Sequence, residues 1–286
     1  MPEFTDAHGV AIVYDVHEAA APARGVVQLL HGVGEHAGRY PALIEALTAA
    51  GFHVYADDHR GHGRTGIRQW NGPAGLGRLG RGGMRATVAA CWQLTELIRD
   101  ERPGLPLVLL GHSWGSFLAQ MLVNQHPEAY DAVILSGSAY RTPADLNALP
   151  LNARWAGPDA DGLEWLSRDA AVWQEFRDDP LTVETPLLKL FGPIEAARMY
   201  GRPKKDLASS RDVPVLLLVG GDDPVGGPRS VHKLADAYKN RSGLSDVTTL
   251  VYPDARHEIF NELQQEQVRA DVLAWLDRRF PAASAR

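Results

Sequence analysis

A serine between two glycines is the part of the chain best suited to chemistry. The run Gly111-His112-Ser113-Trp114-Gly115 follows the apolar segment 105–110 and precedes segment 116–125, whose residues read as a helix. A sharp turn between strand and helix strains the backbone of the serine, and neighbours without a Cβ make room for it. The N-terminus of the helix would face developing negative charge. We therefore predict that Ser113 is a nucleophile.

A nucleophilic serine needs a base that takes its proton and an acid that orients the base. Two later apolar segments end in such groups: Asp222 and Asp223 follow residues 213–219, and His257 follows residues 247–252. In a parallel sheet, functional groups collect at the carboxyl ends of the strands. A serine, an acid and a histidine that follow three strands in this order predict a catalytic triad. The pattern alone leaves either aspartate as the acid.

Strands and helices that would position these residues alternate along most of the chain. The predicted strands cover residues 10–16, 25–30, 53–57, 105–110, 131–136, 213–219 and 247–252. The predicted helices cover residues 40–50, 84–100, 116–125, 229–240 and 262–279. This alternation predicts an α/β fold, in which helices cover both faces of a mostly parallel central sheet.

The alternation stops after the strand at 131–136. Residues 138–206 contain no clear strand; they carry helical patches at 162–177 and 187–200 and the tryptophans Trp155, Trp165 and Trp173. We predict that residues 138–206 form a helical cap, inserted into a core domain made of residues 1–137 and 207–286.

The composition excludes several classes of protein. With 286 residues, 45% of them hydrophobic, the chain is long enough for one large domain that buries about three quarters of its unfolded surface. A net charge of −6 argues against a nucleic-acid partner. The lone cysteine, Cys91, cannot form an internal disulfide and is expected to pack in the core. The N-terminus lacks an apolar signal segment, and no run reaches the about 18 apolar residues of a membrane span. We predict a soluble, cytoplasmic protein, and make no prediction of its oligomeric state.

Four motifs are spread along the chain: His31-Gly32-Val33-Gly34-Glu35-His36 with Arg39-Tyr40, Asp58-His59-Arg60-Gly61-His62-Gly63, Gly111-His112-Ser113-Trp114-Gly115, and Arg256-His257-Glu258 with Asn261-Glu262. Together they resemble the monoacylglycerol lipase and lysophospholipase branch of the α/β-hydrolase superfamily. The resemblance implies the α/β-hydrolase fold, with Ser113 as the nucleophile and His257 as the base. The acid of this family stands directly before the Pro-Val of a Gly-x-x-Asp-Pro-Val turn, which selects Asp223 over Asp222.

The resemblance also implies an oxyanion hole made by the backbone amides of Val33 and Trp114. Two residues depart from the family pattern, because Trp114 replaces a methionine and Ser116 replaces a glycine. Any residue except proline supplies the amide, so the oxyanion hole is expected to persist. The indole of Trp114 is expected to reshape the pocket beside the nucleophile. The Ser116 hydroxyl, one turn into a helix, is expected to bond to the backbone.

The activity implied by the resemblance is hydrolysis of a carboxylic ester through an acyl-enzyme. The substrate would be a monoacylglycerol, a lysophospholipid or a similar apolar acyl ester, with no cofactor. Apolar side chains of the cap would line an acyl channel; they are Trp155, Trp165, Leu187, Leu188 and Phe191. One alternative is amide or lactone hydrolysis, or acyl transfer to an alcohol, on the same triad. Another is a non-catalytic relative that binds a small apolar ligand.

Three further patterns are assigned no catalytic role. Residues 61–66 match G-x-G-x-x-G, but no helix is expected to open there and no acid follows about 20 residues on, which argues against a dinucleotide. Asp57, Asp58, His59 and His62 could ligate a metal, yet a hydrolytic serine needs none. Residues 60–85 contain six arginines and no acid. We interpret this stretch as a solvated flexible loop. The alternative is contact with an anionic substrate or, transiently, with lipid headgroups at a membrane surface.

Overall fold

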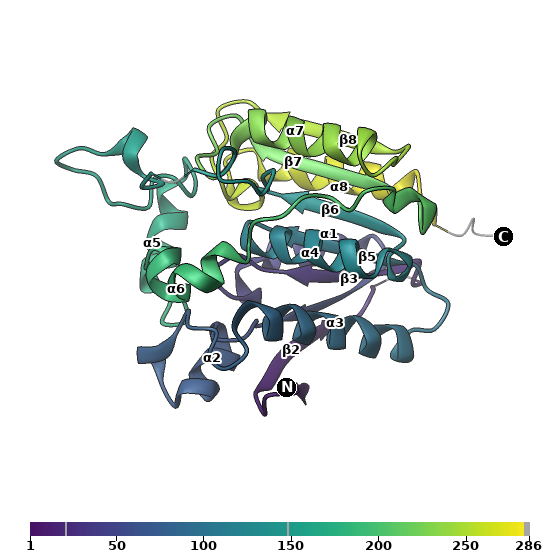
Figure 1. Ribbon diagram of the computed structural model, residues 1–286, viewed down its shortest axis with the longest axis horizontal. Helices are drawn as coiled ribbons and strands as arrows, with labels where there is room; N and C mark the ends of the chain where they lie inside the picture. Colours follow the sequence, from purple (N-terminus) through teal and green to yellow (C-terminus); the bar gives the residue numbers. More distant parts are fainter. Residues whose placement is uncertain (21, 148, 283–286) are drawn as a thin grey trace.

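An eight-stranded sheet forms the centre of the computed structural model, which describes residues 1–20, 22–147 and 149–282 (Figure 1). The strand order is β1-β2-β4-β3-β5-β6-β7-β8. Strand β2 pairs antiparallel with both β1 and β4, and all neighbours from β4 to β8 pair parallel. The strands are β1 (Glu3–Thr5), β2 (Ala11–His17), β3 (Gly25–Leu30), β4 (Phe52–Asp57), β5 (Leu107–His112), β6 (Ala132–Ser136), β7 (Val215–Gly220) and β8 (Val247–Tyr252). The predicted mostly parallel sheet is confirmed.

The central strands are apolar because both of their faces are covered. Every residue of β3, β5, β6 and β7 is buried. The seven predicted strands are present, with ends within two residues of those expected. Strand β1 was not predicted. It has only three residues and is held in the sheet by antiparallel pairing with β2, where Phe4 lies opposite Ile12.

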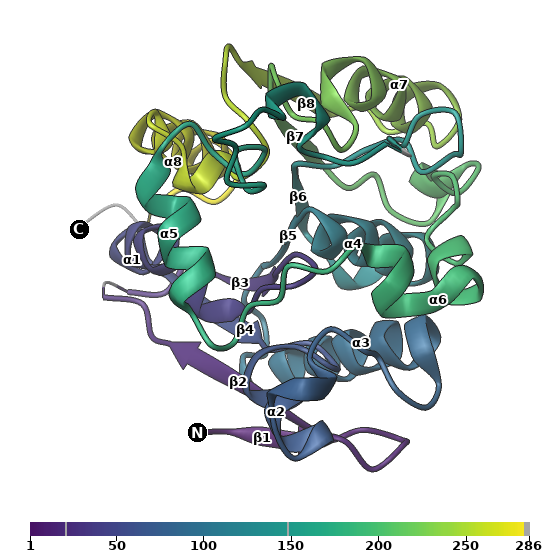
Figure 2. The same ribbon diagram turned by 90° about the vertical axis from the view of Figure 1, so that its left-hand side faces the viewer.

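Helices cover both faces of the sheet, as predicted (Figure 2). One face packs against α3 (Gly83–Glu101), α4 (Trp114–Gln125) and α7 (Gly227–Asn240). The other packs against α1 (Pro41–Ala49) and α8 (Gln265–Asp277). Within the described part of the chain, no helix has both the length and the apolar character needed to cross a membrane.

The prediction that residues 60–85 form a flexible loop is wrong, because helix α2 (Gly63–Trp70) lies within this stretch. The two arginines of α2 pair with acids: Arg64 with Asp15 of β2 at 2.7 Å and with Asp58 of the loop after β4 at 2.6 Å, and Arg68 with Glu3 of β1. At Gly66 a Cβ would lie 2.4 Å from the Gly61 carbonyl oxygen, so close packing explains that glycine. The argument against a dinucleotide site at residues 61–66 rested in part on the expectation that no helix begins there. That part of the argument is therefore wrong.

The chain leaves the sheet between β6 and β7. This segment contains α5 (Ala170–Asp178) and α6 (Leu187–Ala197). Both helices lie at the same end of the molecule (Figure 1), but they are apart from each other across that end, with α5 on the side of α1 and α8 and α6 on the side of α3 and α4 (Figure 2). The predicted helical patch at 162–177 is shorter than expected. Helix α5 begins only after Asp169, whose carboxylate accepts a hydrogen bond from the amide of Ala171. Helix α6 is interrupted at Gly192, where φ is 74° and ψ is 166°.

Candidate active site

Ser113 occupies the strained turn that the sequence predicts between β5 and α4. Its φ of 52° and ψ of −123° lie in a region that residues with a Cβ rarely adopt. A Cβ on Gly111 would lie 2.5 Å from the carbonyl oxygen of Gly115, and one on Gly115 would lie 2.2 Å from that of Leu30. Both glycines are therefore required by close backbone packing. The Ser113 amide donates to the Ser136 carbonyl at 2.9 Å, which ties the turn to β6.

The loops after β7 and β8 bring Asp223 and His257 together. The Nδ1 atom of His257 lies 2.9 Å from Oδ1 of Asp223, and both side chains are buried. The same Oδ1 accepts a hydrogen bond from the Val225 amide at 2.9 Å, which orients the carboxylate. Asp222 instead pairs with Arg154 near the surface. Of the two aspartates that the strand pattern left open, Asp223 is the one in contact with the histidine.

The environment of His257 favours its charged form. Burial opposes charge on the imidazole, but Asp223 and, more weakly, Glu258 and Glu35 outweigh it and raise the pKa of His257 above its ordinary value. The Nε2 atom is buried and has no hydrogen-bond partner among the described residues, so Ser113 Oγ is not bonded to it in this structure. Such contacts commonly tighten only when substrate binds. Nε2 therefore remains free to accept a proton.

Val33 and Trp114, the predicted donors of the oxyanion hole, belong to two different segments of the chain. Val33 is in the β3 loop (residues 31–40, between β3 and α1), and Trp114 is the first residue of α4. Gly32, which directly precedes Val33, would place a Cβ 3.2 Å from the Cβ of Ser113. In the described part of the chain, neither the Val33 nor the Trp114 amide donates a hydrogen bond. Two free amides beside the serine can stabilise an oxyanion.

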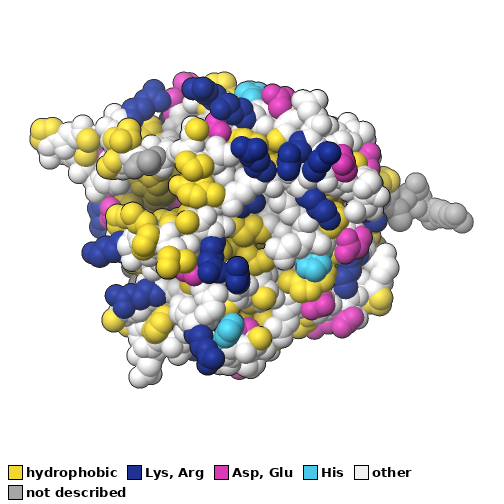
Figure 3. Space-filling view, viewed as in Figure 1, with side chains coloured by type: hydrophobic (Ala, Val, Ile, Leu, Met, Phe, Trp, Pro, Cys, Tyr) yellow, Lys and Arg dark blue, Asp and Glu magenta, His cyan; other side chains and the backbone are white. Residues whose placement is uncertain are grey.

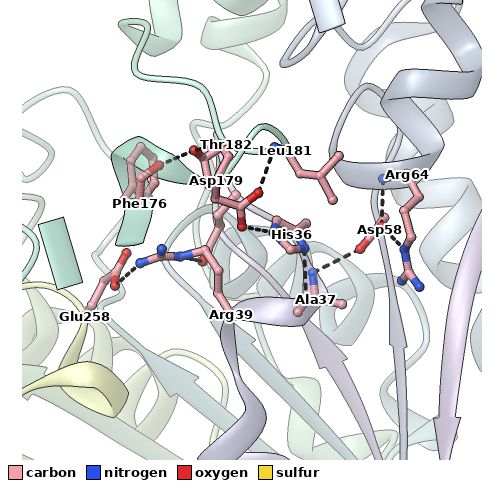
Figure 4. A network of polar contacts seen from close by, with 12 residues as sticks. His36, Ala37, Arg39, Asp58, Arg64, Phe176, Asp179, Leu181, Thr182 and Glu258 are labelled. Carbon is pink, nitrogen blue, oxygen red and sulfur yellow. Dashed lines mark hydrogen bonds and ion pairs between the residues drawn. The ribbon is translucent and has the colours of Figure 1, made fainter. Parts of the chain in front are cut away.

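Buried ion pairs join the β3 loop to the β8 loop (residues 253–264, between β8 and α8). The guanidinium of Arg39 lies between Glu35, at 3.2 Å, and Glu258, at 2.6 Å. Figure 4 shows Arg39 directed at Glu258 and His36 directed at Asp179 of the segment between β6 and β7. Glu35, His36, Arg39 and Glu258 stand in the motifs quoted from the sequence but were assigned no role there, and Asp179 was not singled out. The only signal in the sequence was a charged residue in each of two motifs that follow predicted strands.

The predicted channel residues lie at different distances from the site. Trp165 is closest, with its ring centroid 5.1 Å from that of His257. Phe191 is buried and its ring lies 5.1 Å from that of Trp114. Trp155 packs against the Arg256 guanidinium at 4.6 Å, and Leu187 is partly buried against the core. Leu188 is 61% exposed, so its side chain faces solvent. The structure brings Trp165 and Phe191, but not Leu188, toward the nucleophile.

The two departures from the family pattern have different consequences. The indole of Trp114 is only 1% exposed and packs against His62, at 5.0 Å between ring centroids, and Phe191. It fills the space below α6 rather than standing free in a pocket. The Ser116 hydroxyl donates to the Ser113 carbonyl at 2.6 Å, which confirms its predicted bond to the backbone.

The candidate metal ligands make bonds within the protein. Asp58 accepts hydrogen bonds from Ala37 and Arg64, and His59 Nδ1 lies 2.7 Å from Asp57. Asp57, His59 and Cys91 do offer ligand atoms within 4.8 Å of one another, all of them buried. Burial raises the pKa of the Cys91 thiol well above its usual range, and the residue packs in the core as predicted. That the enzyme needs no metal, and that it is cytoplasmic, stay predictions.

Comparison with known proteins agrees with this geometry. Residues 21–264 match the family described as serine aminopeptidase, S33. The chain is 33% identical over 284 residues to a monoacylglycerol lipase of Mycolicibacterium smegmatis, covering 96% of this chain and 95% of that protein. It is 25% identical to the human monoglyceride lipase, covering 99% and 92% of the two chains. Among solved structures, a thermostable carboxyl esterase from Bacillus coagulans superposes with a TM-score of 0.84 at 25% identity, covering 98% of each chain.

These matches span the sheet and the segment between β6 and β7 alike, so they cover the whole architecture rather than one motif. They confirm the predicted α/β-hydrolase fold and the resemblance to monoacylglycerol lipases. The prediction of a carboxylic ester hydrolase is confirmed at the level of the enzyme class by relatives named as lipases and esterases. The chain therefore belongs to the serine aminopeptidase S33 family of α/β-hydrolases.

Proposed function

We propose that this hydrolase cleaves apolar acyl esters by two-step acyl transfer to water, with Ser113, His257 and Asp223 as the triad. The observation that carries the proposal is the strained Ser113 turn beside a buried His257–Asp223 pair with a free Nε2. His257 Nε2 takes the proton of Ser113 as Oγ bonds to the carbonyl carbon. The amides of Val33 and Trp114 stabilise the oxyanion, each contributing about 3–4 kcal/mol in comparable sites.

The bond to the leaving alcohol then breaks, and His257 returns its proton to the alcohol oxygen. Water attacks the acyl-enzyme while His257 again accepts a proton, and the acid product and free Ser113 are released. Asp223 holds the imidazole with Nε2 toward the serine and stabilises its positive charge throughout. The free enzyme is most active above the pKa of His257, because the base must be neutral to accept the proton.

The test of the triad uses p-nitrophenyl butyrate and three variants. Ser113→Ala and His257→Gln should lose at least about 10³-fold in kcat, with the unfolding transition unchanged. Ser245→Ala is the matched control, because Ser245 is exposed at the surface and its hydroxyl donates to Asp212. A wild-type protein that is folded but inert toward esters would contradict the proposal. Unchanged turnover in Ser113→Ala would do so as well.

A monoacylglycerol or lysophospholipid is the substrate class that we propose. The named relatives support it, and so do the apolar faces of Trp165 and Phe191 near the site. Hydrolysis of monoacylglycerols, lysophosphatidylcholines and simple ethyl esters of matched chain lengths would measure the preference. A kcat/KM that does not rise with acyl length would exclude an acyl channel.

Amide hydrolysis is the second candidate, because the matching family is described as a serine aminopeptidase. Aminoacyl p-nitroanilides assayed beside p-nitrophenyl esters distinguish the two reactions. Acyl transfer would appear as ester product when an alcohol is added. A ligand-binding protein without activity would bind a fatty-acid probe yet show no covalent labelling of Ser113.

We further propose that residues 138–206 act as a cap that contacts lipid surfaces transiently. Figure 3 shows hydrophobic side chains gathered with lysines and arginines over this end of the molecule. Leu188 and Ile194 of α6 are 61% and 69% exposed, beside Lys189. Vesicles of phosphatidylcholine with phosphatidylglycerol should sediment the wild type, and Leu188→Ser with Ile194→Ser should weaken the association. Equal association of both proteins would refute the contact.

A further inference from the structure

Arg39 joins two loops that come from distant strands of the sheet. In the sheet order, β3 and β8 are separated by β5, β6 and β7. The guanidinium of Arg39 pairs with Glu35 of its own β3 loop and with Glu258 of the β8 loop, 219 residues further along the chain. The three side chains are only 7%, 4% and 5% exposed. The ion pair therefore joins loops on either side of β5, the strand that ends directly before Ser113.

Each carboxylate of this group holds a backbone segment next to the chemistry. Glu35 Oε1 accepts hydrogen bonds from the Gly32 amide at 2.6 Å and from the Tyr40 hydroxyl at 2.5 Å. Gly32 precedes Val33, whose amide is proposed for the oxyanion hole. Glu258 directly follows His257, and its carboxylate also accepts from Asn261 at 3.0 Å. Among the described residues, no hydrogen bond joins Arg39 or its two partners to Ser113, so these residues would act through others.

The group carries two carboxylates for one guanidinium and is shielded from water. Burial and the neighbouring Glu258 raise the pKa of Glu35, so Glu258 is the carboxylate that carries the excess negative charge most readily. Phe176 of α5 covers the guanidinium, with its ring centroid 4.8 Å away. A buried charge is costly unless something compensates it. The nearest group that becomes positive during the proposed reaction is the imidazole of His257. His112, at the end of β5, also faces this imidazole, with its ring centroid 4.8 Å from that of His257. Burial, together with His257 and Arg39, keeps the pKa of His112 well below its usual range.

We propose that Glu35, Arg39 and Glu258 form a clamp that holds the β3 loop against the β8 loop and leaves one excess negative charge to stabilise the His257 imidazolium. They are positioning residues, and the inference rests on the proposed function of the triad. The electrostatic sign is consistent with it, since both carboxylates raise the pKa of His257. A clamp that only held the fold together would show no preference for the charge state of the base.

The clamp makes opposite predictions for its two charges. Glu258→Gln keeps an acceptor for Arg39 but removes a negative charge, so the acid limb of the kcat/KM profile should move to lower pH, by about 0.5–1 unit. Arg39→Gln removes the positive charge, leaves two carboxylates, and should move the limb to higher pH by a similar amount. Arg39→Lys keeps the charge but loses the forked geometry. It should lower kcat several-fold without moving the limb.

Arg24→Gln is the matched control. Arg24 is also a nearly buried arginine, pairs with Asp277 at 2.6 Å and packs on a phenylalanine, Phe52, at 4.7 Å, but it lies at the opposite, amino-terminal end of β3. Its replacement should cost stability without moving the pH profile. If Arg39→Gln does not fold, Glu258→Gln and Arg39→Lys still distinguish a shift of the limb from a loss of rate.

The direct readout is the pKa of His257, followed by NMR of the imidazole Cε1–H in a Ser113→Ala background. This measurement needs no turnover, so it remains informative even if the chain is not an esterase. The clamp predicts a lower pKa in Glu258→Gln, a higher one in Arg39→Gln and no change in Arg24→Gln. Shifts of the same sign in the first two variants, or none in either, would overturn it. Ester turnover in the wild type and in Ser113→Ala tests the proposed function. The titration of His257 tests the clamp separately.

Discussion

Two parts of the segment between β6 and β7 contact the site in different ways. Residues 163–168, the anchored arm, run alongside the β8 loop: the His257 and Glu258 amides donate to the carbonyls of Trp165 and Leu166, at 3.2 and 2.7 Å. Helix α6 makes no comparable set of bonds to that loop among the described residues. It contacts the body through apolar side chains, among them Phe191 and Leu190, and through Glu195, which accepts from the Met84 amide at 2.7 Å.

The difference suggests that the two parts of the predicted cap behave differently when substrate binds. The anchored arm is built as an extension of the histidine loop, so it should stay with the base. Helix α6 has a glycine with positive φ at its interruption, two exposed apolar side chains and few polar contacts. Local stability follows the number of buried contacts and bonds. We expect α6 to be the part that moves when substrate enters, and the following predictions test that expectation.

The largest effect on stability is expected when the anchored arm loses its bonds to Glu262 of the β8 loop. This fully buried carboxylate accepts from the amide and Nε of Arg168, each at 3.0 Å, and from the Arg256 amide at 2.9 Å. Glu262→Ala should lower the free energy of unfolding by about 2–4 kcal/mol, because several donors lose a charged partner. Urea unfolding gives the number. Glu262→Gln, which keeps an acceptor, should cost less; equal losses would contradict the role of the charge.

A smaller effect on stability, but a clear one on activity, is expected at Phe191. Phe191→Ala removes the ring that covers Trp114, so kcat/KM for a long-chain ester should fall by about 5–30-fold, corresponding to roughly 1–2 kcal/mol of lost apolar contact. Global stability should change by less than about 1 kcal/mol, because α6 opens locally. Leu188→Ala on the same helix is the control and should leave turnover of a short soluble ester unchanged. A global loss as large as that of Glu262→Ala would remove the distinction between the two parts.

The smallest effect is expected at Gly192. Its φ of 74° and ψ of 166° would cost a residue with a Cβ roughly 1–3 kcal/mol of local strain. Gly192→Ala should therefore speed hydrogen exchange in α6 while leaving residues 163–168 protected. Gly157→Ala, where a Cβ meets nothing within 4 Å, is the matched control in the same segment. Equal acceleration in both parts would mean that they open together.

The sequence predicted best the elements whose signals are local. Buried strands such as β5 are continuous apolar runs, and the turn at Ser113 carries its glycines on either side. Both could be inferred from neighbouring residues. Strand β1 and helix α2 could not, because what stabilises them comes from elsewhere in the chain. Arg64 of α2, for example, finds Asp15 across 49 positions of sequence.

The same reasoning explains which site residues were found. Asp223 was selected by its place before a Pro-Val pair, and contact with His257 singles out the same residue. The Glu35, Arg39 and Glu258 group was not predicted, because each residue alone reads as an ordinary loop charge. Helical spacing also could not tell that Leu188 faces solvent while Phe191, three positions on, is buried. Orientation of that kind is decided by tertiary packing.

Covalent labelling tests the central claim most directly. A fluorophosphonate probe, followed by peptide mass spectrometry, reports whether the serine at the strained turn is activated by the His257–Asp223 pair. We predict one adduct on Ser113 in the wild type, none in Ser113→Ala, and labelling slowed by at least about 10²-fold in His257→Gln. A folded wild-type protein without an adduct, or one labelled at Ser116 instead, would contradict this account.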